Sequence, residues 1–222
     1  MNKIITAVLK IFFQLLYHQF AWLYDAVASL VSLGRWKDWI LAALPFIRGP
    51  RILEIGHGPG HLQVALATRG WNPTGLDASP QMGRLAFHQM EMHGYDPGLV
   101  NGYAKIIPFA NQVFDTVLAT FPTEYIFEPA ALSEVIRILK PDGILLVLPA
   151  AVINPIRPLD RFFAWLFRIT RQAPGRLDSA YIDSVSQPFK HAGFEIETRT
   201  IATHNSQVLL LIGRTFSDNS AC

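Results

Sequence analysis

The sequence is poor in cysteine and in charge. Its one cysteine, Cys222, is the last of 222 residues, which excludes a disulfide framework or a thiolate metal cluster within a single chain. Charged residues make up only 16% of the chain, the net charge is +2, and half of the residues are hydrophobic. This composition excludes a disordered chain and supplies enough apolar side chains for one large buried core.

The few charges are unevenly distributed along the chain. Residues 51–149 carry six Lys/Arg against nine Asp/Glu, whereas residues 1–50 carry five against two and residues 150–176 carry five against one. An acidic central part therefore lies between two basic and strongly apolar segments. Nucleic-acid binding is disfavoured, because a dispersed Lys/Arg surface is missing.

Both basic segments have the pattern of helices. Residues 1–33 show a helical period with a narrow polar stripe, but the apolar run of residues 11–24 is too short for a membrane span. Residues 157–171 combine arginines on one helical face with several aromatic side chains. Each segment fits an ordinary packed helix or a helix at a membrane surface. We expect a cytoplasmic protein and leave peripheral membrane contact through residues 1–33 and 157–171 open.

The central part alternates short apolar runs with helical stretches. We expect strands at residues 51–55, 74–77, 113–119 and 144–148, and helices at residues 61–69, 80–94, 129–140 and 180–191. Residues 141–143 are expected to form a turn, and residues 194–200 and 207–214 are expected to form an antiparallel hairpin. This order predicts an α/β fold with a parallel sheet that is covered by helices on both faces.

A glycine-rich turn follows the first predicted strand. Glu54 ends that strand and is followed by Gly56, Gly58 and Gly60, and Asp77 ends the next strand. Glycines allow a sharp turn and the approach of a ligand to bare backbone N–H groups, and a carboxylate at the second strand end can accept both hydroxyls of a ribose. The pattern predicts an adenosine-type cofactor at the carboxyl ends of the strands.

The details of the turn favour one cofactor over another. In the dinucleotide fingerprint the third glycine falls one residue later, where this chain has His61. A buried carboxylate at Glu54 would repel a pyrophosphate, but it suits the ammonium of S-adenosylmethionine. This cofactor is therefore favoured over a nicotinamide or flavin nucleotide and over a turn that binds nothing. The spacing of His88 and His93 is wrong for one helical face, so no metal is predicted.

Five motifs occur in order between residues 48 and 150. They are Ile52–Gly60, Gly75–Ser79, Pro108–Phe109 followed by Phe114–Asp115, and Leu139–Gly143. In these motifs the chain resembles class I S-adenosylmethionine-dependent methyltransferases, most of all those that act on quinones and phospholipids. The resemblance implies a Rossmann-like three-layer α/β/α sandwich, whose seven-stranded, mostly parallel sheet ends in an antiparallel hairpin. It also implies S-adenosyl-L-methionine as cofactor.

The resemblance further implies roles for single residues. Glu54 and the glycine turn would surround the methionine part of the cofactor, and Asp77 would hold the ribose. The residues expected to bind the cofactor are Glu54, Gly56, His57, Gly58, Gly60, Asp77, Ala78, Met82, Tyr103, Ala104, Thr120 and Phe121. Tyr103 stands where the family often has aspartate. No general base is fixed by the pattern, and the candidates are Glu124, Tyr125 and His204.

The domain organisation and function follow from these points. We expect an N-terminal hydrophobic or amphipathic helical cap at residues 1–47 and a methyltransferase domain at residues 48–216 with a helical insertion at residues 151–176. The cap and the insertion would cover an apolar acceptor pocket. The predicted function is S-adenosylmethionine-dependent methyl transfer to a small hydrophobic or lipid-like acceptor. The alternative is a membrane-attached protein that binds the cofactor without turnover.

Overall fold

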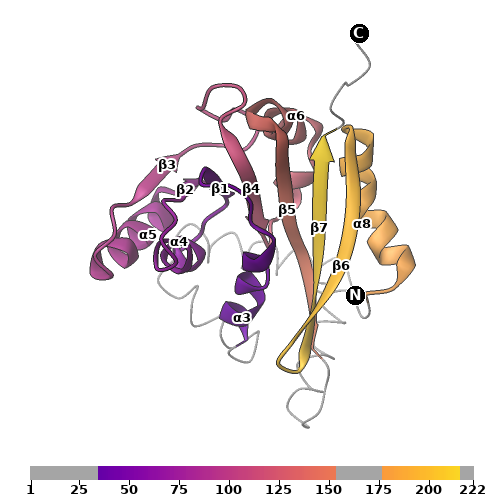
Figure 1. Ribbon diagram of the computed structural model, residues 1–222, viewed down its shortest axis with the longest axis horizontal. Helices are drawn as coiled ribbons and strands as arrows, with labels where there is room; N and C mark the ends of the chain where they lie inside the picture. The colour runs from indigo at the N-terminus through magenta and orange to yellow at the C-terminus, as the bar shows by residue number, and fades with distance from the viewer. Residues whose placement is uncertain (1–34, 154–176, 216–222) are drawn as a thin grey trace, which may run out of the picture.

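The computed structural model describes residues 35–153 and 177–215, so the predictions for residues 1–33 and 157–171 lie outside the described residues. Its centre is a seven-stranded sheet in the order β3-β2-β1-β4-β5-β7-β6 (Figure 1). All strand pairs are parallel except β5–β7 and β6–β7. The strands are β1 (Ile52–Ile55), β2 (Thr74–Asp77), β3 (Gly98–Asn101), β4 (Phe114–Thr120), β5 (Leu139–Ile153), β6 (Phe194–Thr203) and β7 (Ser206–Thr215). The predicted sheet with its antiparallel hairpin is confirmed.

Helices connect the strands, and their starts follow the local sequence. Ser79 precedes α5 and its Oγ accepts a hydrogen bond from the N–H of Met82, and Asp178 caps α8 through the N–H of Tyr181. Proline occupies the first position of α5 and of α6, where no N–H is needed. The described helices are α3 (Trp36–Leu41), η2 (Leu44–Phe46), α4 (His61–Ala67), α5 (Pro80–Met92), η3 (Glu124–Phe127), α6 (Pro129–Ile138) and α8 (Ser179–His191).

Two hydrophobic cores lie on the two faces of the sheet. On one face, Val135 of α6 and Phe189 of α8 pack against Val117 of β4. On the other face, Trp39 of α3 and Leu66 of α4 pack against inward-facing strand residues. The central strands β4 and β5 are buried on both faces, which explains their nearly continuous apolar sequences.

The structure differs from the sequence-based expectation at two strands. The sequence analysis missed β3, which has four residues and pairs with β2 although its ends are exposed. The expected turn at residues 141–143 lies inside β5, where the register with β4 shifts between Phe114 and Thr116. At its other end β5 continues to Ile153, which pairs with Ser206, so the expected insertion cannot begin at residue 151.

The topology brings the ends of the central strands to one edge of the sheet. Since β1, β2 and β4 are parallel neighbours, Ile55, Asp77 and Thr120 end at the same edge. In α/β sheets this edge is where ligands bind. No helix within residues 35–153 and 177–215 has the length and apolar character needed to cross a membrane.

Candidate functional site

The glycine turn joins β1 to α4 in a conformation that requires glycine. Gly56, Gly58 and Gly60 have φ angles of 76°, 53° and 89°, in the left-handed region that other residues rarely adopt. A Cβ on Gly60 would lie 2.8 Å from the Cβ of Ala86, because α5 packs against the turn. A Cβ on Gly58 would meet nothing within 4 Å. The turn is therefore packed on one side and open at Gly58.

Asp77 connects the end of β2 to this turn. Its carboxylate accepts one hydrogen bond from the N–H of Gly58 at 2.9 Å and another from the N–H of Ser79 at 2.8 Å. Its backbone carbonyl accepts hydrogen bonds from the Asn101 side chain and the Gly102 N–H. Asp77 is only 3% exposed. The two strand ends and the glycine turn are thus held together around one buried carboxylate.

A second buried carboxylate, Glu54, lies on the neighbouring strand. Its Oε2 accepts a hydrogen bond from Gln63 Nε2 at 2.7 Å, and its Oε1 accepts a longer one from Thr120 at 3.4 Å. Burial raises the pKa of Glu54 to about 8, and the charge of Asp77 adds to the increase, while the Gln63 hydrogen bond opposes it. Gln63 is fully buried and its Oε1 has no hydrogen-bond partner. Gln63 Oε1 is therefore available as a hydrogen-bond acceptor, and a bound cation would stabilise the ionised form of the Glu54 carboxylate.

His57 and Tyr125 shape the same turn from two sides. The His57 Nδ1 lies 2.7 Å from the carbonyl oxygen of Gly58, so this ring nitrogen carries the donated proton. Burial lowers the pKa of His57, against the opposing influence of Asp77. The Tyr125 hydroxyl donates to the carbonyl of Ile55 at 3.0 Å and lies against Gly56 so closely that a Cβ there would clash. Tyr125 thus packs against Gly56 and is hydrogen-bonded to the end of β1.

The end of β4 carries an aromatic cluster that the sequence did not reveal. Phe121 has a φ of 47°, which is unusual for a bulky residue. Its ring centroid lies 4.7 Å from that of Trp36 and 5.9 Å from that of Trp39. Residues from α3 therefore reach the end of β4, where Thr120 donates a hydrogen bond to Glu54.

The segment between β3 and β4 is held by α6. Arg137 donates hydrogen bonds to the carbonyls of Ile107 and Phe109, and its ion pair with Glu134 brings the Glu134 carboxylate to the N–H of Ile107. The hydrogen bond from Arg137 lowers the pKa of Glu134, so the pair stays charged. Tyr103, which precedes this anchored stretch, is 62% exposed.

The remaining predicted site residues occupy different surroundings. Ala78 follows Asp77 and is exposed, Met82 is fully buried at the start of α5, and Ala104 packs against the core. Glu124 is exposed at the start of η3. His204 lies in the β6–β7 turn, and β7 is three strand positions from β1, or about 14 Å across the sheet. His204 is therefore not brought to the glycine turn by the topology.

Two residues that contribute to the site were missed. Gln63 stands between the core residues Leu62 and Leu66, and a polar residue in that apolar pattern is the only sequence clue to its role. Arg137 gives no clue beyond a charged residue in a helix. Within the described residues, no group of three His, Cys, Asp or Glu side chains is placed to share a metal ion.

Known proteins with a similar sequence are methyltransferases. The family described as "Methyltransferase domain" matches residues 52–143. The chain is 31% identical over 159 residues to an uncharacterized methyltransferase, sll0829, of Synechocystis sp., covering 68% of each chain. It is 30% identical over 151 residues to a demethylmenaquinone methyltransferase of Thermobifida fusca, covering 66% of this chain and 64% of that one.

The fold has close counterparts among solved structures. One is a protein of Methanococcus maripaludis assigned as an S-adenosyl-L-methionine-dependent methyltransferase, with a TM-score of 0.63, 18% identity, and coverage of 88% of this chain and 92% of that chain. At this identity the similarity shows the fold alone. The chain spans between 52% and 68% of the length of the curated relatives it matches.

Proposed function

Since the chain belongs to the class I S-adenosylmethionine-dependent methyltransferase family, we propose that it transfers a methyl group from S-adenosyl-L-methionine to a small, lipid-like acceptor. The observation that carries this proposal is the pair of buried carboxylates, Glu54 and Asp77, at adjacent strand ends around the glycine turn. Two buried carboxyl groups at adjacent strand ends suit a cationic nucleoside better than a pyrophosphate.

The residues of the turn fit this cofactor. The unpartnered Gln63 Oε1 and the Glu54 carboxylate offer acceptors to the ammonium of the methionine part. Asp77 would hold the ribose hydroxyls, and the open space at Gly58 supports the approach of a ligand to the turn. When bound, the cofactor supplies a methyl group that its sulfonium makes electrophilic.

The protein itself would align the acceptor with the methyl group and exclude water. The Trp36, Trp39 and Phe121 cluster at the end of β4 is apolar and supports an apolar acceptor. The relative named as a demethylmenaquinone methyltransferase is consistent with a lipid-like acceptor of this kind. Among the candidate bases, the Tyr125 hydroxyl already donates to the Ile55 carbonyl, and Glu124 is exposed. We assign no general base.

Calorimetric titration with S-adenosylhomocysteine tests the cofactor part of the proposal. We expect saturable binding to the unaltered protein and a loss of affinity of about tenfold or more, or about 1.4 kcal/mol, in Asp77→Asn. Asp96→Asn is the matched control, because Asp96 is exposed in the connection before β3. Absence of binding to the folded, unaltered protein would contradict the proposal, as would equal affinity in the two variants. Urea unfolding of each variant verifies that the fold is retained.

The acceptor part needs a transfer assay. Radiolabelled methyl from the cofactor should enter the organic phase when the protein is incubated with a bacterial lipid extract. At a cofactor concentration below saturation, the transfer should fall about tenfold or more in Asp77→Asn. A protein that binds S-adenosylhomocysteine but transfers no label to lipid, amine or phenol acceptors would instead be a cofactor-binding protein without turnover.

A further inference from the structure

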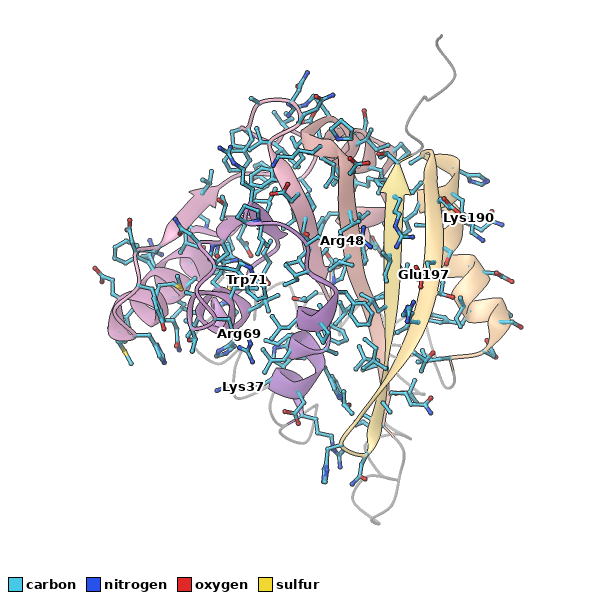
Figure 2. All side chains as sticks on the ribbon, in the orientation of Figure 1. Lys37, Arg48, Arg69, Trp71, Lys190 and Glu197 are labelled. Carbon is cyan, nitrogen blue, oxygen red and sulfur yellow. The ribbon has the colours of Figure 1, made fainter. Side chains whose placement is uncertain are left out.

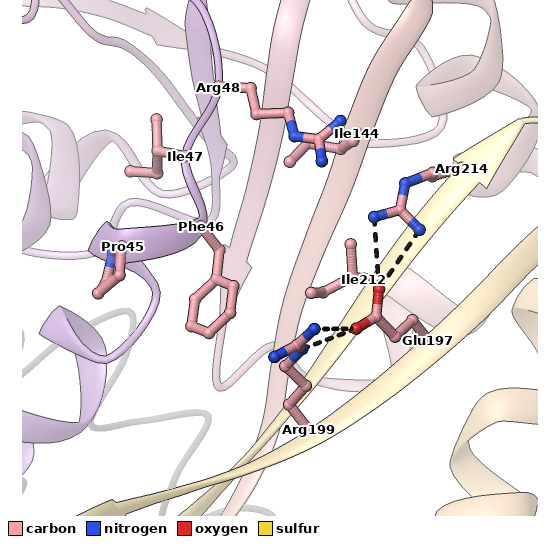
Figure 3. A pocket seen from close by; sticks show the side chains of 9 residues that line it. All are labelled: Pro45, Phe46, Ile47, Arg48, Ile144, Glu197, Arg199, Ile212 and Arg214. Carbon is pink, nitrogen blue, oxygen red and sulfur yellow. Dashed lines mark hydrogen bonds and ion pairs between the residues drawn. The ribbon is translucent and has the colours of Figure 1, made fainter.

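A cavity of about 190 Å³ lies at the opposite end of the sheet from the glycine turn. Three arginines, Arg48, Arg199 and Arg214, surround it (Figure 3). Ile144, near the start of β5, pairs with Arg214, near the end of the antiparallel strand β7. Because β1, β2 and β4 carry the candidate cofactor site at their other ends, this cavity is a separate place in the molecule.

One carboxylate serves two of the three arginines. Glu197 accepts a hydrogen bond from Arg199 Nε at 2.7 Å and lies 3.3 Å from Arg214 Nη2. The hydrogen bond from Arg199 lowers the pKa of Glu197, so the carboxylate is ionised at neutral pH. With one Glu and three Arg, the lining side chains carry a net charge of +2.

The third arginine, Arg48, is anchored through its backbone. The Arg48 N–H donates to Thr116 Oγ1 at 3.0 Å, and the Thr116 hydroxyl donates back to the Arg48 carbonyl at 2.7 Å. Within residues 35–153 and 177–215, the Arg48 guanidinium makes no hydrogen bond or ion pair. Figure 3 shows the Arg48 side chain reaching over Ile144 toward Arg214, from the opposite side of the cavity.

The arrangement is held in place before any ligand arrives. The Arg199 guanidinium carbon lies 5.7 Å from the centre of the Phe46 ring, and the same guanidinium is fixed by Glu197. The floor is apolar, since Ile144 and Ile212 line the cavity between the charged groups. A ligand therefore meets one fixed guanidinium, that of Arg199, beside an apolar base.

We propose that this cavity binds a phosphate group, contributed by a phosphate ester. Guanidinium groups bind phosphate oxygens through paired N–H donors, and a doubly charged phosphate matches the net charge of +2 better than a carboxylate does. The apolar floor provides contact for the organic part of the ester. The inference does not depend on the proposed methyl transfer, because the two sites share no residue.

The isoleucines allow a test that is specific for the site. Methyl NMR spectra of isoleucine-labelled protein are recorded during titration with inorganic phosphate and with phenyl phosphate, at constant ionic strength. We expect saturable shifts at Ile47, Ile144 and Ile212, which line the cavity, and none at Ile126, which is fully buried under the other face of the sheet. Phenyl phosphate should bind at least threefold more tightly than phosphate, because of the apolar floor.

A matched pair of variants identifies the binding group. Arg48→Gln should weaken phenyl phosphate binding at least fivefold, whereas Arg69→Gln should change it less than twofold. Arg69 is an exposed arginine two residues after α4, and Figure 2 shows it away from Arg48 and Glu197. An unchanged Ile126 signal verifies that the fold is retained. Equal effects in the two variants, or shifts that rise without saturation, would overturn the proposal.

A flotation assay separates the two sources of phosphate. Vesicles of phosphatidylcholine with phosphatidic acid, whose phosphate is a monoester, are compared with vesicles of phosphatidylcholine alone. Flotation that requires the anionic lipid and Arg48 identifies a lipid phosphate as the ligand, and soluble-ester binding without flotation identifies a free phosphate ester. If neither vesicles nor soluble esters bind in an Arg48-dependent way, the cavity is not a phosphate site.

Discussion

Replacing Glu54 by glutamine should change how the stability of the protein depends on pH. Burial raises the pKa of Glu54 to about 8 in the folded state, against an ordinary value of 4.5. Between these two values the folded protein keeps a proton that the unfolded chain has released. The contribution of Glu54 to the free energy of unfolding is therefore fully present below pH 4.5 and is lost as the pH rises toward 8.

The size of the effect follows from the two pKa values. The slope is about 1.36 kcal/mol per pH unit for one proton, so the unaltered protein should lose about 3 kcal/mol relative to Glu54→Gln between pH 5 and pH 8. Glutamine has nearly the same shape, and its amide oxygen can still accept the hydrogen bond from Gln63 Nε2, so the comparison isolates the ionisation.

Urea unfolding of the protein at pH 5, 6, 7 and 8 measures this difference. Other groups titrate in the same range, among them His57, whose pKa is lowered by burial. Their contribution cancels when the variant is subtracted from the unaltered protein. Glu91→Gln is the control, because Glu91 is exposed on α5, and its difference should be flat. A difference for Glu54→Gln that does not change with pH would refute the burial of an ionisable carboxyl at this position.

Three further predictions follow from the site and its supports. Gly60→Ala should destabilise the protein by about 3 kcal/mol or more in urea unfolding, because it combines backbone strain with a close contact against Ala86. Gly70 also has a positive φ, 84°, but open space around it, so Gly70→Ala should cost only about 1 kcal/mol in the same assay. Binding of S-adenosylhomocysteine at pH 7 should release close to one proton from Glu54, because the cationic ammonium of the ligand favours the ionised carboxylate. Calorimetry in buffers of different ionisation enthalpy measures the number of protons released. A value of zero would contradict the contact between the ammonium and Glu54. Arg137→Met should raise the amide hydrogen exchange of residues 103–112 about tenfold without a comparable change in β1, and equal exchange in both forms would show that the ion pair does not hold this segment.

The part of the fold that the sequence predicted is the part with strong local patterns. The turn Gly56–Gly60 and Asp77 at the end of β2 were found because glycine spacing and strand length are visible in one stretch of chain. The strand β3 was missed, because four half-exposed residues carry no clear period. The length of β5 was underestimated, because Pro141 and Gly143 are typical of a turn. In the structure both residues lie within β5, where the register with β4 is irregular.

The part of the site that the sequence could not predict depends on long-range contacts. Phe121 contacts Trp36, which lies 85 positions earlier in the chain, and Gln63 reaches Glu54 only when α4 packs against the turn. The phosphate cavity collects its arginines from the segment before β1 and from the two final strands. No local pattern relates these residues, because only the order of strands in the sheet brings them together.

The contact between Phe121 and the two tryptophans has a practical consequence for chimeras. Phe121 has a positive φ; its N–H donates to the carbonyl of Leu148 in β5, and its ring packs against two tryptophans of α3. Exchanging the first 47 residues for those of a relative would remove the ring contacts and leave only the backbone hydrogen bond to hold this conformation. A graft meant to alter acceptor preference should therefore transplant α3 and the β4 exit as one unit.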